Sequence, residues 1–306
     1  MKSTLQFFTP LALLLGALAP LTAQAEVATA AGAPETRAGT LRELIRVRCS
    51  TDGEDQWTVW QGKLFSFVPG RRPELLFDLV GANVARCAKD SRNRWFITSR
   101  ELMYYLDPET GERVDRWRNP LTTEEVPVVH VANDLVQSIL RGSPDITTSG
   151  PLATLRIDIP LFYPNALFRD ANLKPYSPMR MYQAAESFGL VTTTAALSER
   201  SPSAPMSFTW HRLGPWLPWM NMGRRPGILF YSADGSKVSS YEQLPALIRQ
   251  EIDARLPRYR NAPRCYVRRK NVTSWSYFSE QLEAYKGGET QFPAAAPLLE
   301  GECPAG

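Results

Sequence analysis

The chain contains only two histidines, His130 and His211. Imidazole is well suited to general acid–base catalysis near neutral pH, so these two residues are the candidate catalytic groups. His130 has an alternative role as a core residue, because on a strand it shares its face with apolar neighbours. Asn133 and Asp134 follow closely and are candidates to orient a ligand. Alternatively, they cap a short helix over residues 134–140.

A second candidate region is rich in tryptophan and runs from Phe208 to Gly223. Strand alternation places Trp210 and Arg212 on one face and His211 on the other. Two prolines then hold the next tryptophans on a stiff loop, as in a pocket wall for a flat apolar ligand or a sugar ring. The alternative is a hydrophobic plug in one end of a barrel. The residues predicted to bind a ligand are Asn133, Asp134, Arg156, Trp210, Arg212, Trp216 and Trp219.

No motif in the sequence indicates a cofactor or a metal. The chain has no GxGxxG, Walker loop, HExxH or GxSxG. The histidines with Asp134 or Asp158 are suitable ligand types, but they lack the paired spacing of metal sites. The 35 basic and 31 acidic residues are too balanced for a protein that neutralises nucleic-acid phosphates. We therefore expect no cofactor, no metal, no nucleic acid and a small-molecule ligand.

The first 25 residues have the pattern of a secretory signal peptide. Lys2 precedes an apolar run from Leu5 to Leu21, and a small-x-small site allows cleavage after Ala25. The alternative is a membrane anchor, but the run is shorter than the ~20 residues of a typical span. No later run is long and apolar enough to span a membrane. The sequence thus predicts export to the periplasm or secretion, with no stable membrane span.

Export makes the four cysteines, Cys49, Cys87, Cys265 and Cys303, candidates for disulfides. Four cysteines allow three pairings, and the sequence does not choose among them. We favour Cys49–Cys87 and Cys265–Cys303, because each pair lies within one terminal part of the chain. No spacing is CxxC, which disfavours a redox motif or a zinc knuckle.

Residues 41–286 predict one mainly β domain. Short runs of aromatic and β-branched residues are separated by turn signals such as Asp107-Pro108-Glu109-Thr110-Gly111. Such a series predicts a large antiparallel meander, either barrel-like (calycin-like) or an open curved sheet, with one or two short helices. The helical spacing is clearest from Leu244 to Ile252.

The two ends of the chain carry weaker signals. Residues 26–40 predict a flexible leader, and residues 287–306 predict an extended tail. Two last strands are expected, over Cys265–Arg269 and Ser274–Phe278.

Several motifs together resemble the domain-of-unknown-function 1838 (DUF1838) family, in a consistent order from about Leu41 to Phe278. They are Val129–Asp134, Asp107–Gly111 with Arg116–Pro120, Gly214–Gly223 and Asn271–Phe278. The resemblance implies a single domain and a shared pattern around the histidines and tryptophans. It carries over no activity and no catalytic residue.

Three functions remain open from the sequence. The first is a cofactor-independent exported enzyme of isomerase, cyclase, lyase or hydrolase type, acting on a small apolar or aromatic molecule with His130 and His211 as acid and base. The second is a non-catalytic periplasmic carrier that uses the same pocket. The third is a structural protein of the envelope. Histidines that converge on one open cavity favour the first, and the sequence does not predict the oligomeric state.

Overall fold

The structure is a computed structural model that describes residues 33–289, with gaps at 268–269 and 272. The predicted signal peptide, residues 26–32 of the expected leader, Cys303 and most of the expected tail lie outside the described residues. The described part of the leader includes strand β1 (Glu35–Ala38), which pairs with β8 and so is not an irregular segment.

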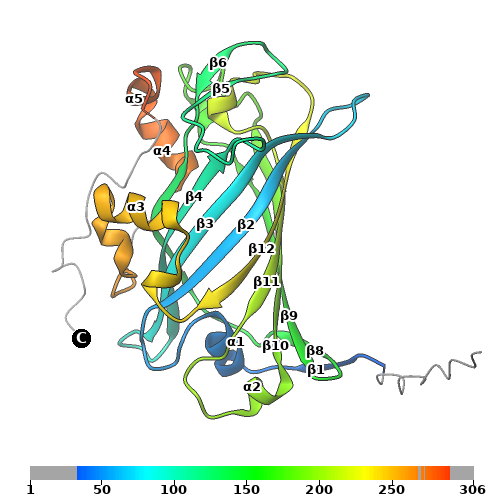
Figure 1. Ribbon diagram of the computed structural model, residues 1–306, viewed down its shortest axis with the longest axis vertical. Helices are drawn as coiled ribbons and strands as arrows, with labels where there is room; N and C mark the ends of the chain where they lie inside the picture. Colours follow the sequence, from blue (N-terminus) through cyan, green and yellow to red (C-terminus); the bar gives the residue numbers. More distant parts are fainter. Residues whose placement is uncertain (1–32, 268–269, 272, 290–306) are drawn as a thin grey trace, which may run out of the picture. The chain divides into compact units, whose positions relative to one another are not determined.

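The fold is mainly β, as predicted, and its centre is a ten-stranded antiparallel sheet (Figure 1). The strand order is β1-β8-β9-β10-β11-β12-β2-β3-β4-β7, so the sheet is open rather than closed into a barrel. Its other strands are β2 (Gln56–Phe67), β3 (Glu74–Lys89), β4 (Trp95–Leu106), β7 (Val131–Ile139), β8 (Asp145–Ser149), β9 (Leu152–Pro164), β10 (Met181–Thr193), β11 (Ser207–Gly214) and β12 (Ile228–Val238). A separate ribbon joins β5 (Arg116–Arg118) to β6 (Glu125–Pro127).

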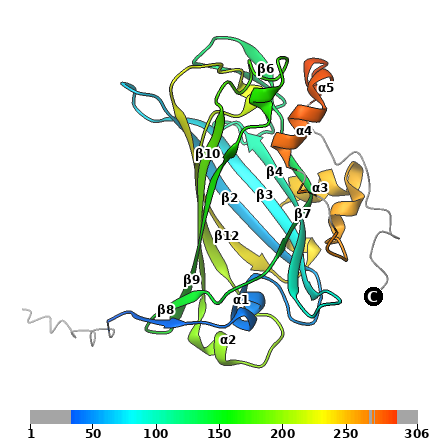
Figure 2. The ribbon, with the colours of Figure 1, turned by 180° about the vertical axis from the view of Figure 1, so that it is seen from behind.

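The central strands form because apolar residues alternate between two covered faces. On β2, Trp60 and Leu64 point to the face that we call the inner face, whereas Trp57 and Val59 point to the outer face. The sheet curls around the inner face, since residues of β4 and β10 interact electrostatically although four strands separate them in the sheet. Figure 2 shows this inner face framed by β9 and β10 on one side and β4 and β7 on the other.

Helices cover the sheet locally. Helix α3 (Ala246–Ala254) lies beside β3 and β4 on the outer face (Figure 1), where Ile248 and Ile252 pack on Val80 and Leu102. The shorter helices are α1 (Leu41–Arg48), α2 (Thr194–Ser198), α4 (Ser274–Glu280), α5 (Leu282–Lys286), and the 3₁₀ turns η1 (Leu167–Arg169), η2 (Pro218–Met220), η3 (Tyr241–Gln243) and η4 (Pro257–Arg260).

Two predicted elements are wrong, and residues 265–267, the described part of the strand expected over Cys265–Arg269, are not in a strand either. Residues 134–140 belong mostly to strand β7, because they pair with β4 instead of forming the predicted helix. Residues 274–280 form helix α4 rather than a strand, because Thr273 and Ser276 cap its first turn through reciprocal backbone–side-chain hydrogen bonds.

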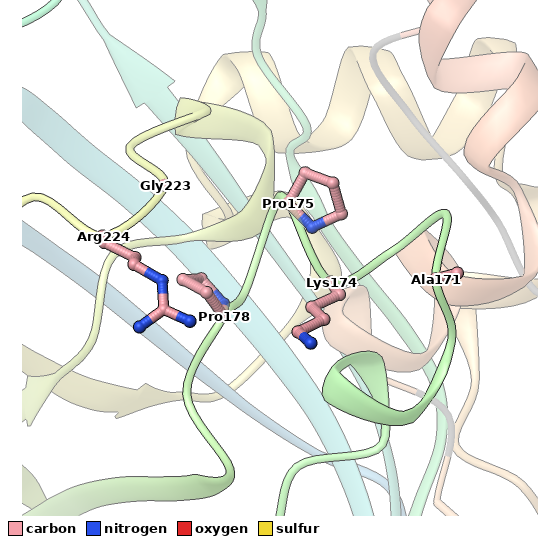
Figure 3. A pocket seen from close by; sticks show the side chains of 6 residues that line it. All are labelled: Ala171, Lys174, Pro175, Pro178, Gly223 and Arg224. Atoms are coloured by element: carbon pink, nitrogen blue, oxygen red, sulfur yellow. The ribbon is translucent and has the colours of Figure 1, made fainter.

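The loops at one end of the sheet enclose a surface pocket of about 340 Å³ (Figure 3). One wall comes from the loop between β9 and β10, through Lys174 and Pro178. The other comes from the loop before β12, through Gly223 and Arg224.

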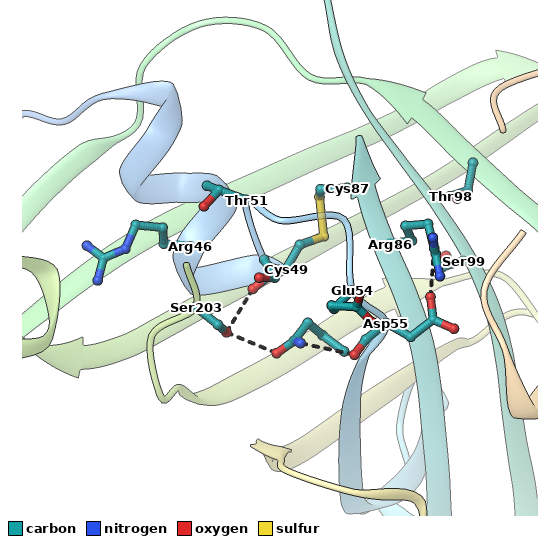
Figure 4. The surroundings of a disulfide bond; sticks show 12 residues. Arg46, Cys49, Thr51, Glu54, Asp55, Arg86, Cys87, Thr98, Ser99 and Ser203 are labelled. Carbon is teal, nitrogen blue, oxygen red and sulfur yellow. Dashed lines mark hydrogen bonds and ion pairs between the residues drawn. A yellow bond between two sulfur atoms is a disulfide. The ribbon is translucent and has the colours of Figure 1, made fainter. Parts of the chain in front are cut away.

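Helix α1 is tied to the sheet by a disulfide bond between Cys49 and Cys87, as predicted (Figure 4). The two cysteines are 38 positions apart in the sequence, and the bond joins the end of α1 to β3. The side chain of Arg46 donates to the carbonyls of Ala196, Leu197 and Ser201, which fixes α1 against α2. The second predicted pairing involves Cys303, outside the described residues, and stays a prediction.

Across residues 33–289, apart from the gaps, no helix is long and apolar enough to cross a membrane. The same residues contain no group of three or more histidine, cysteine or acidic side chains arranged to hold a metal ion.

Candidate functional site

A continuous row of polar residues crosses the inner face of the sheet. Strand register places its five members side by side on β12, β2, β3, β4 and β7: Lys237, Thr58, Asn83, Glu101 and Asn133. We call them the inner polar row. Three of them, Thr58, Asn83 and Asn133, are buried. Polar groups on a core face cost free energy unless they are paired, so this row marks the inner face as the candidate site.

Two glutamates face this interior from opposite parts of the sheet. Glu101 on β4 accepts a hydrogen bond from Asn133 at 2.7 Å, and burial and the nearby charge of Glu186 raise its pKa. Burial also raises the pKa of Glu186 on β10, against the opposing effect of Arg212. Glu101 thus senses the charge of Glu186, and carboxyls whose pKa is raised are suited to general acid–base catalysis.

Arg212 on β11 connects the second glutamate to a group of tyrosines. Its Nε lies 3.2 Å from Oε1 of Glu186, and it donates a hydrogen bond to the hydroxyl of Tyr182. Its guanidinium lies over the ring of Tyr231, 5.1 Å from the centroid, and the hydroxyls of Tyr231 and Tyr105 are 3.5 Å apart. Burial alone would lower the pKa of Arg212, but the surrounding tyrosines and Glu186 outweigh it and raise the pKa. Arg212 therefore keeps its charge.

Three buried polar atoms on the inner face have no hydrogen-bond partner among the described residues. They are Nε1 of Trp60, Oδ1 of Asn83 and Nε1 of Trp210. The indole of Trp60 lies directly over Gly81, where a Cβ atom would come within 2.2 Å of the ring. Two donors and one acceptor without partners are candidate contacts for a polar group of a ligand.

Lys237 closes the row at its β12 end. Its Nζ donates to the carbonyls of Arg46 and Cys49 and to Oγ of Ser203, at 2.9–3.0 Å. Burial lowers its pKa to about 7, and the charges of Arg48 and Arg46 add to this effect. Deprotonation of this side chain is therefore easier than for an exposed lysine, although the charged form supplies all three of these hydrogen bonds.

Arg48, the last residue of α1, is half-buried and lies close enough to interact with Glu101 and Lys237. Its guanidinium makes no hydrogen bond or ion pair with any residue that the structure describes. Burial lowers its pKa, but a guanidinium still carries its charge at neutral pH. A half-buried guanidinium without a partner is the candidate group for an anionic ligand.

The inner face keeps solvent contact despite its position. Arg48, Glu101, Glu186 and Trp210 are all half-buried rather than buried. The site therefore combines two carboxyls whose pKa is raised, a cation without a partner among the described residues and aromatic rings, on a surface that solvent reaches in part.

A family model described as a protein of unknown function, DUF1838, matches residues 53–282. The chain belongs to the DUF1838 family. The resemblance noted in the sequence is thereby confirmed. The DUF1838 match contains the whole inner polar row, Glu186 and Arg212, whereas Arg48 lies before it. No curated protein and no solved structure matches the chain.

In this DUF1838 protein, the side chain of His130 is buried beside β4. Its Nδ1 accepts a hydrogen bond from the backbone N–H of Tyr105, and its Nε2 lies 3.3 Å from Oδ1 of Asp115. Its ring packs against the rings of Tyr104 and Tyr105. Burial lowers its pKa, which favours the neutral form with the proton on Nε2, donated to Asp115. These contacts match the alternative role of His130 as a core histidine.

His211 points to the outer face and is exposed, with its ring stacked on Phe230 at 5.8 Å. His130 is instead buried in the core, so the two histidines do not converge on one site. Arg156 is also exposed on the outer face and pairs with Asp158.

The other predicted residues divide between the inner face and the core. Asp134 is buried and pairs with Arg100 at 2.9 Å and Arg258 at 3.5 Å. Trp216 and Trp219 are buried in the main core, which matches the alternative of a hydrophobic plug.

Of the predicted site residues, the structure brings Asn133, Trp210 and Arg212 together on the inner face. Sequence reasoning did not select Glu101 or Glu186. One weak signal was present: Leu102 and Met103 follow Glu101, and Ala184 and Ala185 precede Glu186, so each carboxylate borders an apolar part of its strand.

Proposed function

We propose that this DUF1838 protein is a cofactor-independent enzyme that moves protons within a small aromatic or apolar molecule bearing an anionic group. The observation that carries this proposal is the pair of half-buried glutamates on the inner face, Glu101 and Glu186, of which Glu186 lies close enough for its charge to act on Glu101. Perturbed carboxyls that interact with a specific partner are typical of catalytic acid–base pairs.

The proposed reaction is an isomerisation. One glutamate, as carboxylate, takes a proton from a carbon of the substrate, and the other, as carboxylic acid, returns a proton to a different atom. The double bond shifts, the composition of the substrate does not change, and the two carboxyls end with exchanged protonation states. The indole N–H groups of Trp60 and Trp210 are placed to stabilise negative charge on a substrate oxygen. Arg48 would hold the anionic group.

We further propose that the protein acts outside the cytoplasm, after cleavage at Ala25. The Cys49–Cys87 disulfide supports this location, because structural disulfides persist mainly in oxidising compartments.

Binding is tested by titrating the protein with 1-naphthoate, an aromatic carboxylate, while tryptophan fluorescence is recorded. We expect saturable quenching, with Arg48→Gln weakening the affinity by about tenfold, the loss of one charged hydrogen-bonding partner. His211→Ala, on the outer face, is the matched control and should bind as the wild type does. Equal affinity of all three proteins would contradict an inner-face site.

Catalysis is tested on the small molecules that co-purify with the protein, identified by mass spectrometry and incubated with it in D₂O. An isomerase should exchange substrate hydrogen for deuterium. Glu101→Gln and Glu186→Gln should each reduce the exchange rate by about 10²–10⁴-fold while the compound still binds. Binding without any exchange in the wild type would instead support the carrier function, and no bound compound together with no quenching would support a structural protein.

A further inference from the structure

Three neighbouring loops at one end of the sheet carry a concentration of positive charge. They are residues 68–74, 165–180 and 221–227, which we call the basic loops. They contain seven cations against only two acids, Glu74 and Asp170. The cations are Arg71, Arg72, Arg169, Lys174, Arg180, Arg224 and Arg225. All seven side chains are exposed, and none forms an ion pair with any residue of the described ranges.

The fold itself brings the basic loops together. Phe67, the last residue of β2, pairs with Ile228, the first residue of β12, which places loops 68–74 and 221–227 side by side. Lys174 and Arg224 line the pocket between loops 165–180 and 221–227, and Figure 3 shows their side chains on either side of Pro178. Unpaired cations that share one small surface repel each other, so their proximity calls for a negative partner.

Large apolar side chains are exposed at the same end. Phe67 and Ile228 are 39% and 44% exposed, Met179 is 58% exposed and Phe162 is 64% exposed. Phe67, Ile228 and Phe162 lie on the outer face by strand register, and Leu213 lies between them, 45% exposed. These residues form most of the exposed large apolar side chains among the described residues. Clustered exposed apolar groups indicate an interaction surface.

We propose that this end of the protein docks on the surface of an anionic lipid membrane. The basic loops would contact lipid phosphates, while Phe162, Met179, Phe67 and Ile228 would enter the boundary between headgroups and acyl chains. This combination favours a lipid surface over an acidic polymer, because a polymer satisfies the cations and leaves the apolar side chains in water. The proposal is independent of the glutamate pair and of the reaction proposed for it.

The experiment is co-sedimentation with vesicles of equal parts phosphatidylglycerol and phosphatidylcholine, compared with vesicles of phosphatidylcholine alone. The wild type should bind the anionic vesicles and dissociate as the salt concentration rises. A variant with Arg71, Arg72, Arg224 and Arg225 changed to Glu should lose about tenfold or more in vesicle affinity. A Phe162→Ser, Met179→Ser variant should also bind more weakly but keep the dependence on salt.

The control is Arg92→Glu with Arg200→Glu, two exposed cations in the loops at the opposite ends of the strands, and it is compared with Arg71→Glu with Arg72→Glu, which changes the net charge by the same amount. The control removes charge from the same chain and should leave vesicle binding unchanged. All variants share one N-terminus, so differences between them report on the basic loops alone, and thermal midpoints verify their folding.

Three outcomes would overturn the proposal: no binding to anionic vesicles, equal binding by the variant with the four arginines replaced, or equal loss in the control. Self-association that Phe162→Ser and Met179→Ser abolish, without vesicle binding, would instead assign the surface to a second copy of the chain.

Discussion

Two polar rows cross the same sheet, one on each face, and they behave differently. The outer polar row contains Asp78, Lys63, Ser232, His211, Ser187 and Asp158, again as cross-strand neighbours. There, Lys63 pairs with Asp78 at 2.7 Å and Ser187 donates to Asp158 at 2.6 Å, which lowers the pKa of Asp158. On the inner face the pKa of Glu101 is raised instead, because burial outweighs its hydrogen bond from Asn133.

The comparison shows that residue type alone does not create chemistry. Both rows contain a lysine and a carboxylate, and only the outer row contains a histidine. Water solvates the outer charges and screens them, whereas the inner charges must be balanced by a few fixed neighbours. Of the two rows, the inner one, which has no histidine, therefore contains the carboxyl whose pKa is raised.

The largest effect should come from breaking one ion pair on each face. Arg212→Met leaves the half-buried Glu186 and the buried Tyr182 without their cation, which should lower the free energy of unfolding by about 3 kcal/mol. Lys63→Met breaks the exposed pair with Asp78 and should cost at most about 1 kcal/mol. Urea unfolding measures both values, and equal losses would mean that the two faces do not differ.

The large features of the fold could be predicted from the sequence because they depend on local patterns. Alternating apolar residues and turn signals were sufficient for an antiparallel sheet, and proximity along the chain was sufficient for Cys49–Cys87. The helix predicted over residues 134–140 does not form, and the reason is tertiary contacts. Asn133 was a plausible cap for a helix, but its side chain binds Glu101 and the following residues complete the edge of the sheet beside β4.

The candidate site was harder to predict, because it depends on register between distant strands. A single glutamate in a strand is normally read as a solvent-facing residue, and Glu101 and Glu186 are 85 positions apart. Only the curl of the sheet brings them within electrostatic reach. Trp210 and Arg212 were selected for the right face, since alternation along β11 separates them from His211 without any knowledge of the other strands.

An intermediate effect should separate the two histidines. His130→Ala removes the acceptor for the N–H of Tyr105 and the donor to Asp115 inside the protein, which should cost about 1–3 kcal/mol. His211→Ala removes an exposed ring from the outer row and should change stability by less than about 0.5 kcal/mol. Thermal unfolding with calorimetry tests this difference. A larger loss for His211→Ala than for His130→Ala would reverse the assignment of core and surface.

The smallest effect, and the sharpest test of the comparison, is the sign of a pH dependence. The pKa of Glu101 is higher in the folded state than in the unfolded state, so the folded state binds more protons and stability falls as pH rises above the usual glutamate range. Glu101→Gln keeps an acceptor for Asn133 without the charge. It should therefore be more stable than the wild type at neutral pH and close to it in acid.

Asp158→Asn, on the outer row, should change the stability in the opposite direction. Because the folded-state pKa of Asp158 is lowered, its carboxylate stabilises the fold above the usual aspartate range and loses that contribution as pH falls. The variant should be slightly less stable than the wild type at neutral pH and equal to it in acid. Unfolding free energies measured from acid to neutral pH compare the two variants directly. If both variants changed stability with the same sign, Glu101 would be a stabilising surface-like carboxylate, and the acid–base pair on the inner face would lose its physical basis.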